Sequence, residues 1–150
     1  MATLTIPTTY GYTILTCAVL PAITSTVMGS MVMSARKKYS VPYPNLYGTP
    51  GFHKQADEFN RAQRGHQSMF EVITSFTALA LLGGMKHPIT TAVAGLLFCV
   101  GNVLFLMGYA DTALEIEGAR YKKGGALKHV GMILALGTSI SCAGSIIGWW

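Results

Sequence analysis

The feature that most constrains this chain is a set of four long stretches with few or no charged residues. They run over Tyr10–Met33, Gln67–Met85, Pro88–Tyr109 and His129–Trp150. Each approaches or exceeds the roughly 20 residues that a helix needs to cross a bilayer. Backbone amides inside hydrocarbon must be satisfied within their own segment, so these stretches are predicted to be helices rather than strands.

The composition agrees with burial in lipid. Only 11% of the 150 residues are charged and the mean hydropathy is +0.42, which is too apolar for an ordinary soluble domain. We therefore expect residues 1–150 to form one all-α domain with four transmembrane helices. The first stretch follows no basic segment and precedes Ala35-Arg36-Lys37-Lys38, so it is predicted to be a retained helix rather than a cleaved signal peptide.

The basic residues are distributed unevenly. Six lie between the first and second stretches, four lie between the third and fourth, and Lys86 alone lies in the second turn. The positive-inside rule therefore predicts that the connections over residues 34–66 and 110–128 are cytosolic and that both termini lie on the far side. The aromatic residues near the two ends of the chain are then predicted to anchor the far interface: Tyr10, Tyr12, Trp149 and Trp150.

The connection between the first two stretches has two parts. Residues 41–51 contain three prolines and two glycines, a composition that excludes a helix. From Lys54 the pattern is polar and helical, and it runs without a breaker into the second stretch. That helix is therefore predicted to project beyond the membrane.

Three cysteines, Cys17, Cys99 and Cys142, fall in three different stretches. They show no CxxC spacing, and no histidine lies near them in the sequence. This pattern is typical of small packing residues, and we expect no metal site.

A polar stripe lies at the start of the second stretch. Arg61, Arg64, Ser68 and Glu71 follow one another at spacings of three, four and three, which places them on one helix face. An isolated charge among acyl chains costs at least a few kcal/mol, so such a stripe normally faces a bundle interior or a wet cavity. Two interpretations stay open. The stripe forms a binding site, or the arginines extend to the headgroups while Glu71 pairs with one of them structurally.

Several polar residues converge on the predicted cytosolic ends of the helices: Arg36, Arg64, Glu71, Tyr109 and Arg120. A small anionic ligand that carries an amine would find both cationic and anionic partners there. Taken singly, a tyrosine at this depth is typical of an interfacial belt, and a basic cluster is typical of a topology signal.

Three segments carry a family resemblance: Ser34-Ala35-Arg36-Lys37-Lys38-Tyr39, Phe59–Val72 and Met107-Gly108-Tyr109. Over nearly its whole length the chain resembles the membrane-associated proteins in eicosanoid and glutathione metabolism. Within that family it is most similar to the type-three microsomal glutathione S-transferases. The resemblance implies a left-handed four-helix bundle assembled as a homotrimer, with glutathione bound between neighbouring subunits near the cytosolic face.

The resemblance also implies roles for individual residues. Arg64 is expected to bind a glutathione carboxylate, and Glu71 is expected to bind the γ-glutamyl amine. The other expected glutathione contacts are His66, Ser68, Tyr109 and, from a neighbouring subunit, Arg36. The family places its thiol-activating arginine just after the third span, where the best match is Arg120, with Lys122 and Lys123 as rivals.

The function implied by the resemblance is that of a glutathione-dependent transferase or peroxidase. A cation beside the sulfur favours the thiolate, which is the nucleophile. The second substrate would be a lipophilic electrophile or a lipid hydroperoxide that arrives through the bilayer. The expected partners are glutathione as co-substrate and membrane lipid, with no nucleic acid, in the endoplasmic reticulum or another intracellular membrane.

The alternative function is a non-enzymatic one. A family member that has lost activity would act as a lipid-binding scaffold or as an accessory subunit of a larger membrane complex. Ser68 favours this alternative because the family usually has asparagine there. The connection from Tyr109 to Arg120 favours it as well, because it is a few residues longer than is usual.

Overall fold

The structure, a computed structural model, describes residues 6–149, and every regular element in that range is a helix. The first rod is continuous and consists of α1 (Tyr10–Ile14), η1 (Leu15–Val19) and α2 (Leu20–Lys38). The other long helices are α3 (Ala56–Gly84), α4 (Pro88–Tyr109) and α6 (Leu127–Ile147). One short helix, α5 (Ala119–Lys122), lies in the last connection. The all-α prediction is confirmed for the described residues.

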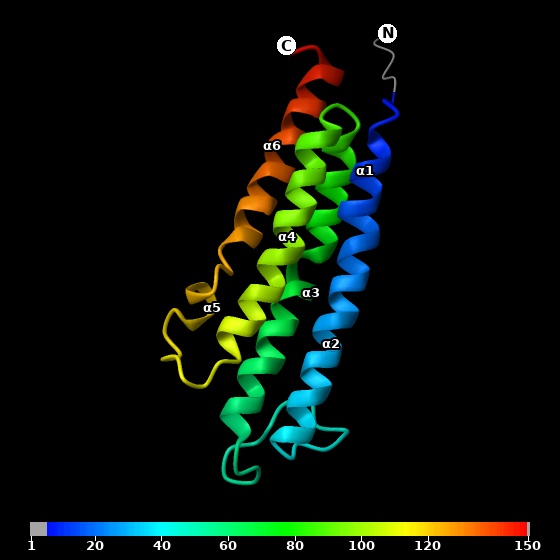
Figure 1. Cartoon of the computed structure of the whole chain (residues 1–150). Helices are drawn as coiled ribbons and strands as arrows, with labels where there is room; N and C mark the ends of the chain where they lie inside the picture. The colour runs from blue at the N-terminus through cyan, green and yellow to red at the C-terminus, as the bar shows by residue number, and fades with distance from the viewer. Residues whose placement is uncertain (1–5, 150) are drawn as a thin grey trace.

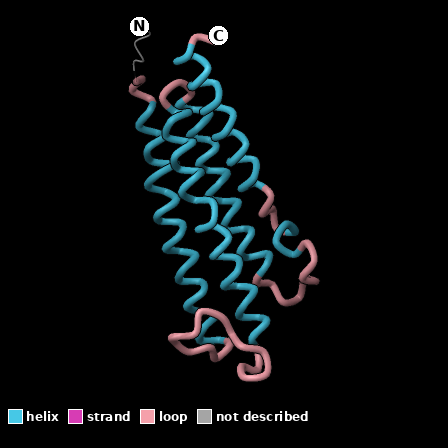
Figure 2. The backbone as a smooth tube through the Cα atoms, turned by 180° about the vertical axis from the view of Figure 1, so that it is seen from behind, coloured by secondary structure: helices cyan, strands magenta, loops and turns pink. Residues whose placement is uncertain are grey.

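The long helices lie side by side (Figure 1). α3 and α4 form the centre of the array, because each packs against the other, against the first rod and against α6. The start of α1, the end of α6 and the tight α3–α4 turn lie at one end of the array, and the connections of residues 39–55 and 110–126 lie toward the other (Figures 1 and 2). The two long connections therefore share one side, as the charge pattern predicts.

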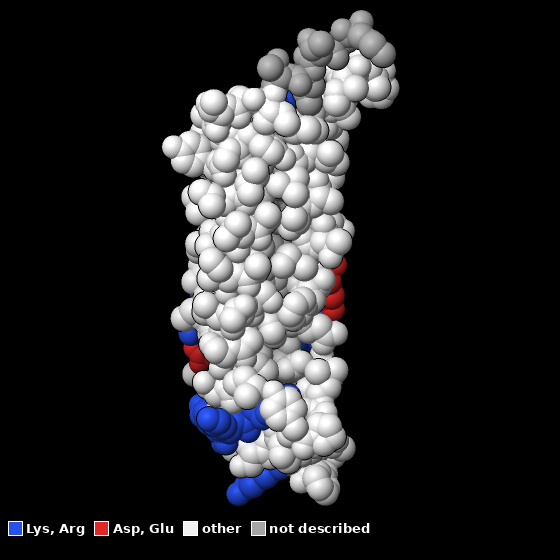
Figure 3. Space-filling model, turned by 90° about the vertical axis from the view of Figure 1, so that its right-hand side faces the viewer, with Lys and Arg blue, Asp and Glu red and all other residues white. Residues whose placement is uncertain are grey.

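Three of the described helices are long and apolar enough to cross a membrane: Tyr10–Lys38, Pro88–Tyr109 and Leu127–Ile147. α3 is not among them, because its apolar part also carries polar residues such as Gln67, Ser68 and Glu71. The prediction of four spans is thus supported at three helices, and the span at α3 stays a prediction. On the face drawn in Figure 3, lysine and arginine side chains gather at the end that carries the connections.

The observed boundaries refine the predicted ones. The first helix continues past Met33 to Lys38, and α3 begins at Ala56, so the polar segment before the second stretch is helical as predicted. Its projection beyond the membrane stays a prediction. α6 ends at Ile147, where Gly148 adopts a left-handed conformation with φ 77°. The fourth stretch was predicted to reach Trp150, which lies outside the described residues. The connection after α4, predicted as a loop, contains the turn of helix α5.

Pro21 explains an irregularity in the first rod. Proline has no N–H and its ring clashes with the carbonyl four residues earlier, which here belongs to Cys17. The rod widens into the π-helical segment η1 just before Pro21, and Thr77 of α3 donates a hydrogen bond to the Cys17 carbonyl oxygen at 3.1 Å. A neighbouring helix thus satisfies the carbonyl that the proline leaves free.

The core between the helices is tightly packed. The rings of Phe76 and Phe98 stack with centroids 3.8 Å apart, joining α3 to α4. Cys17, Cys99 and Cys142 are free and buried, and the Cys17 thiol donates to the Thr91 carbonyl oxygen at 3.2 Å. The prediction that the cysteines serve packing is confirmed.

Candidate functional site

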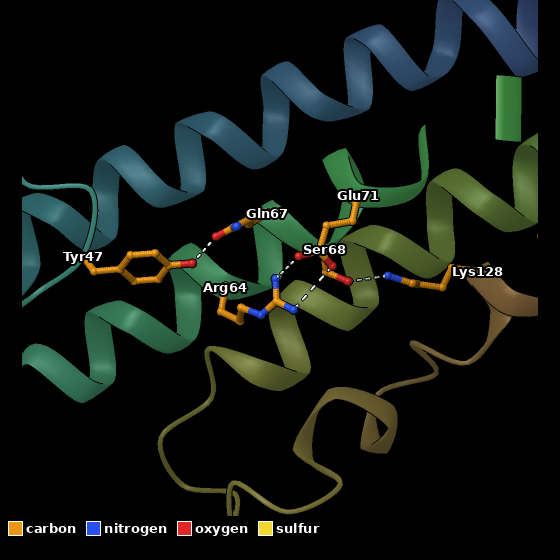
Figure 4. Close-up of polar contacts among 6 residues, drawn as sticks. All are labelled: Tyr47, Arg64, Gln67, Ser68, Glu71 and Lys128. Atoms are coloured by element: carbon orange, nitrogen blue, oxygen red, sulfur yellow. Dashed lines mark hydrogen bonds and ion pairs between the residues drawn. The ribbon is translucent and has the colours of Figure 1, made fainter. Parts of the chain in front are cut away.

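An ion pair lies on the outer face of α3. The Arg64 guanidinium binds both carboxylate oxygens of Glu71, with Nη1 close to Oε1 and Nη2 3.4 Å from Oε2 (Figure 4). The two residues are two helical turns apart, so their side chains share one face. Of the two side chains, 45% and 46% of the surface stays exposed.

The rest of α3 explains why this pair points outward. Gly65 packs against the backbone of Leu106 in α4, because a Cβ on Gly65 would lie only 3.0 Å from the Leu106 Cα. Met69 and Phe76 are fully buried on the same inward side. The helix therefore presents its apolar residues to α4 and α6. Arg64 and Glu71 lie on its opposite face, which no other helix of the described residues covers.

Ser68 lies between the two members of the ion pair and has a partner from another helix. The Lys128 ammonium, at the start of α6, donates to the Ser68 hydroxyl oxygen at 2.7 Å (Figure 4). The same ammonium lies 4.1 Å from the centre of the Phe105 ring, and only 4% of Lys128 is exposed. Sequence reasoning missed Lys128. It precedes the predicted fourth span by one residue, where a lysine usually extends to the headgroups.

Arg61, one turn before Arg64, has a different role. Its Nε donates to the Tyr109 carbonyl oxygen at 2.6 Å, and its Nη2 donates to the carbonyl oxygens of Asp111 and Leu114 at 2.8 and 3.1 Å. These bonds join α3 to the chain that leaves α4. Arg61 thus holds the connection in place.

A groove of about 580 Å³ opens beside the contact between Arg61 and the segment that follows α4. It has the size of a typical small-molecule site, roughly 300–1,000 Å³. The residues that line it include Tyr47, Asn60, Arg61, Arg64, Tyr109 and Ile116. The structure thus brings Tyr109 and Arg64 to one groove, and Ser68 and Glu71 continue from Arg64 along α3.

Three predicted site residues lie apart from this cluster within the chain. His66 turns toward the first rod, where its Nε2 lies 3.1 Å from the Ser25 carbonyl oxygen. Arg36 is buried and donates to the carbonyl oxygens of Val41 and Asn45 at 3.0 and 2.7 Å. The exposed Arg120 lies over the ring of its neighbour Tyr121, 5.3 Å from the ring centre.

The rival cations near Arg120 are placed as follows. The Lys123 ammonium pairs with the Asp111 carboxylate at 2.7 Å, and the Ala113 N–H donates to the same carboxylate at 3.0 Å. The Lys123 hydrogen bond, followed by that of the Ala113 amide, holds the pKa of Asp111 below its usual value. Lys123 is therefore engaged in the connection, and Lys122 lies exposed on α5.

Comparison with known protein families bears on this arrangement. Residues 14–146 match the model of the MAPEG family. The chain belongs to the MAPEG family. The resemblance is thereby confirmed at the family level, and together with the three apolar helices it identifies an integral membrane protein. The MAPEG family includes glutathione transferases, glutathione peroxidases and related proteins, so membership agrees with a site for glutathione without selecting one activity.

Proposed function

We propose that this MAPEG protein is a glutathione-dependent membrane transferase or peroxidase, most similar to the type-three microsomal glutathione S-transferases. The observation that carries the proposal is the half-exposed Arg64–Glu71 pair on α3. If α3 crosses the membrane, two charged groups facing acyl chains would be unfavourable by several kcal/mol. A polar occupant on this face removes that penalty.

Glutathione has the right chemistry for this face. Its γ-glutamyl end carries a carboxylate and an ammonium on one carbon atom. The carboxylate would take the place of Glu71 on the Arg64 guanidinium, and the ammonium would bind the Glu71 carboxylate. Charge-assisted hydrogen bonds of this kind are among the strongest in proteins. The groove beside Arg64 and Tyr109 supplies room for the rest of the peptide.

The proposal includes an oligomeric state and an orientation in the membrane. We propose a homotrimer of four-helix bundles in which a neighbouring copy covers the polar face of α3 and supplies Arg36. The groove then opens toward the cytosol, where glutathione is available. An endoplasmic reticulum or other intracellular membrane supplies the lipophilic electrophile or lipid hydroperoxide from the side.

The placement of Arg120 favours the second candidate, a non-enzymatic scaffold or accessory subunit. Its guanidinium lies over Tyr121, and no hydrogen bond or ion pair joins it to Arg64, Ser68 or Glu71 within residues 6–149. If no cation acts on the sulfur, bound glutathione would stay a thiol and the protein would bind without catalysing.

Two measurements on the purified protein in detergent test the proposal. Equilibrium dialysis gives the affinity for glutathione, and the ultraviolet absorbance of the thiolate reports ionisation of the bound thiol. Arg64→Ala should weaken binding by the roughly 1.5–3 kcal/mol of a hydrogen bond to a charged group, which is about 10- to 150-fold. Glu71→Gln should weaken it as well. Lys54→Ala removes the same charge from the exposed loop before α3 and should leave affinity unchanged.

The outcomes separate the candidates. Binding with thiolate formation supports the enzyme. Binding without thiolate at any accessible pH supports the scaffold. Wild-type affinity in both Arg64→Ala and Glu71→Gln would show that the ion pair is structural, as the other interpretation of the stripe has it.

A further inference from the structure

Thr112 is the one serine or threonine in the connection of residues 110–126. It lies in the turn that leaves α4, and its side chain is exposed at the groove beside Arg61. No hydrogen bond of its hydroxyl group occurs in the part of the chain that the structure describes. The hydroxyl therefore has no structural partner there, and it is open to modification.

The segment around Thr112 is wrapped round the Arg61 guanidinium. Arg61 donates from Nε and Nη2 to three carbonyl oxygens on both sides of Thr112, those of Tyr109, Asp111 and Leu114. Its third nitrogen, Nη1, carries two N–H donors, and neither has a partner among the described residues. Arg61 is only half-buried and lines the same groove as Thr112. An anion on the Thr112 side chain would thus find unused donors nearby.

The charges of the groove are ordered along α3. Asp57 and Glu58 lie in the first turn of the helix, and Arg61 and Arg64 follow about one and two turns later. All four line the groove together with Thr112. A dianion on Thr112 would be repelled by the two carboxylates and attracted by the two guanidinium groups. It would therefore lie toward Arg64, the residue that the proposed function assigns to a glutathione carboxylate.

The residues that follow Thr112 are acidic. Glu115 and Glu117 stand three and five positions later, and both are exposed. Acidophilic protein kinases select a hydroxyl residue by such carboxylates, which bind their basic substrate cleft. The turn has no helix or strand to unfold, and the charge pattern predicts that it is cytosolic. Ser40 and Thr49, exposed in the other connection, have no acidic residue three positions later.

We infer that Thr112 is a phosphorylation site that controls entry of glutathione to the groove, an inference that rests on the proposed function. The Thr112 oxygen forms a bond to the γ-phosphorus of ATP. The bond from that phosphorus to ADP breaks, its electron pair leaves with ADP, and the hydroxyl proton passes to a base of the kinase. The new group carries a charge of about −1.5 to −2 at pH 7 and three acceptor oxygens. It binds Nη1 of Arg61 and competes with glutathione for Arg64.

The test compares the purified protein in detergent before and after treatment with casein kinase II and ATP. Fragment mass spectra should place one phosphoryl group on Thr112. Equilibrium dialysis should show about tenfold weaker glutathione binding, the lower end for loss of a hydrogen bond to a charged group. A protein phosphatase should restore the affinity. Hydrogen-exchange protection of residues 110–118 should increase, because the phosphate adds a bond to Arg61.

Three variants separate the phosphate from other effects of the treatment. Glu115→Gln removes the carboxylate that the kinase reads and should slow phosphorylation while the hydroxyl stays in place. Thr112→Val accepts no phosphate, so its affinity and exchange should be the same before and after treatment. Arg64→Met should still gain exchange protection on phosphorylation, because Arg61 is intact. Its residual glutathione affinity should no longer fall, because the residue for which phosphate and glutathione compete is gone.

The possible results distinguish this inference from the proposed function. If the kinase transfers no phosphate to Thr112 in the folded protein, the inference is wrong. It is equally wrong if a phosphorylated protein binds glutathione as tightly as the untreated one. If the untreated protein binds no glutathione, the proposed function fails, and the exchange measurement decides the contact by itself. Increased protection of residues 110–118 then supports a phosphate site at Arg61, and unchanged protection overturns it.

Discussion

The two ends of the helix array are joined by different means. At the end with the tight α3–α4 turn, helices approach closely at small residues. A Cβ on Gly83 would lie 2.7 Å from the Ser139 nitrogen, and one on Gly84 would lie 2.7 Å from the Thr13 hydroxyl oxygen. At the end with the connections, cationic side chains reach from one element to another, as Arg61 does to three carbonyl oxygens beyond α4.

This difference shows where a membrane protein can place a site. Close contact at Gly83 and Gly84 leaves no room for a ligand between the helices that meet there. Where side chains bridge the helices instead, a groove remains, and charges such as Arg64 and Glu71 face outward with each other as their partners. The polar end therefore carries the candidate site, and the glycine end fixes the helices that present it.

The largest effect on stability is expected at the polar end, from Arg61→Met. The substitution removes three hydrogen bonds from a charged donor, so we expect roughly 3 kcal/mol of destabilisation, the upper end for one such bond, since solvent replaces part of the loss. Titration with a denaturing detergent in mixed micelles measures it. Limited proteolysis should also cut residues 110–118 faster.

Arg64→Met is the matched control, one turn further along α3. It should weaken glutathione binding as Arg64→Ala does and keep wild-type stability, because Arg64 bonds only to Glu71 among the described residues. If Arg64→Met destabilised the protein as much as Arg61→Met, the assignment of a structural role to Arg61 and a binding role to Arg64 would be wrong.

A smaller effect is expected at the glycine end, from Gly83→Ala. The new methyl group would meet the backbone of α6, and overpacking of this kind usually costs about 1–3 kcal/mol. Gly137→Ala is the control, since a Cβ there has no atom within 4 Å. The same detergent titration compares them. Glutathione affinity should be unchanged in Gly137→Ala, and a stability loss there equal to that of Gly83→Ala would contradict the close-packing account.

The smallest effect is expected at the Asp111–Lys123 ion pair, which is exposed and screened by salt. The folded-state pKa of Asp111 is lowered, so the pair stabilises the connection above the ordinary carboxyl pKa near 3.8 and is lost as the pH falls through the lowered value. Hydrogen-exchange protection of residues 110–118 should therefore decrease on acidification.

In Asp111→Asn, the hydrogen-exchange protection of residues 110–118 should already be low at neutral pH. It should not fall further through titration of residue 111. High salt should reduce the wild-type protection toward that of the variant. A pH profile unchanged by Asp111→Asn would assign the acid response to another group.

Much of the fold follows from the sequence because hydropathy and backbone chemistry are local. Four long apolar stretches, proline-rich residues 41–51 and the charge pattern are sufficient to predict the helices, the loop and the shared side of the connections. The sequence predicts less where a feature depends on contacts between helices. Pro21 signals a disturbed helix, but the π-helical segment and its support by Thr77 depend on the neighbouring helix.

The site shows the same division. Spacing alone predicts that Arg64, Ser68 and Glu71 share a helix face, and the structure places them so. The helix ends predict a common location for Arg36 and Arg120, and the family resemblance adds His66. The single chain does not bring these three residues together, and the resemblance assigns Arg36 to a neighbouring subunit. His66 shares a helix with the cluster, yet its position on the turn directs it to the first rod. Which side of α3 meets which helix is not encoded in the spacing of α3 itself.

By itself the sequence determined an all-helical chain with at least three spans, the family to which it belongs and a polar stripe too costly to leave in lipid. Only the tertiary structure decided that Arg61 holds a connection, that Arg64 pairs with Glu71, and that Lys128 turns inward to Ser68. The reason is physical. A residue's transfer energy is its own property, whereas its partners depend on how closely two backbones approach, as Gly101 lets α4 and α6 do at Lys128.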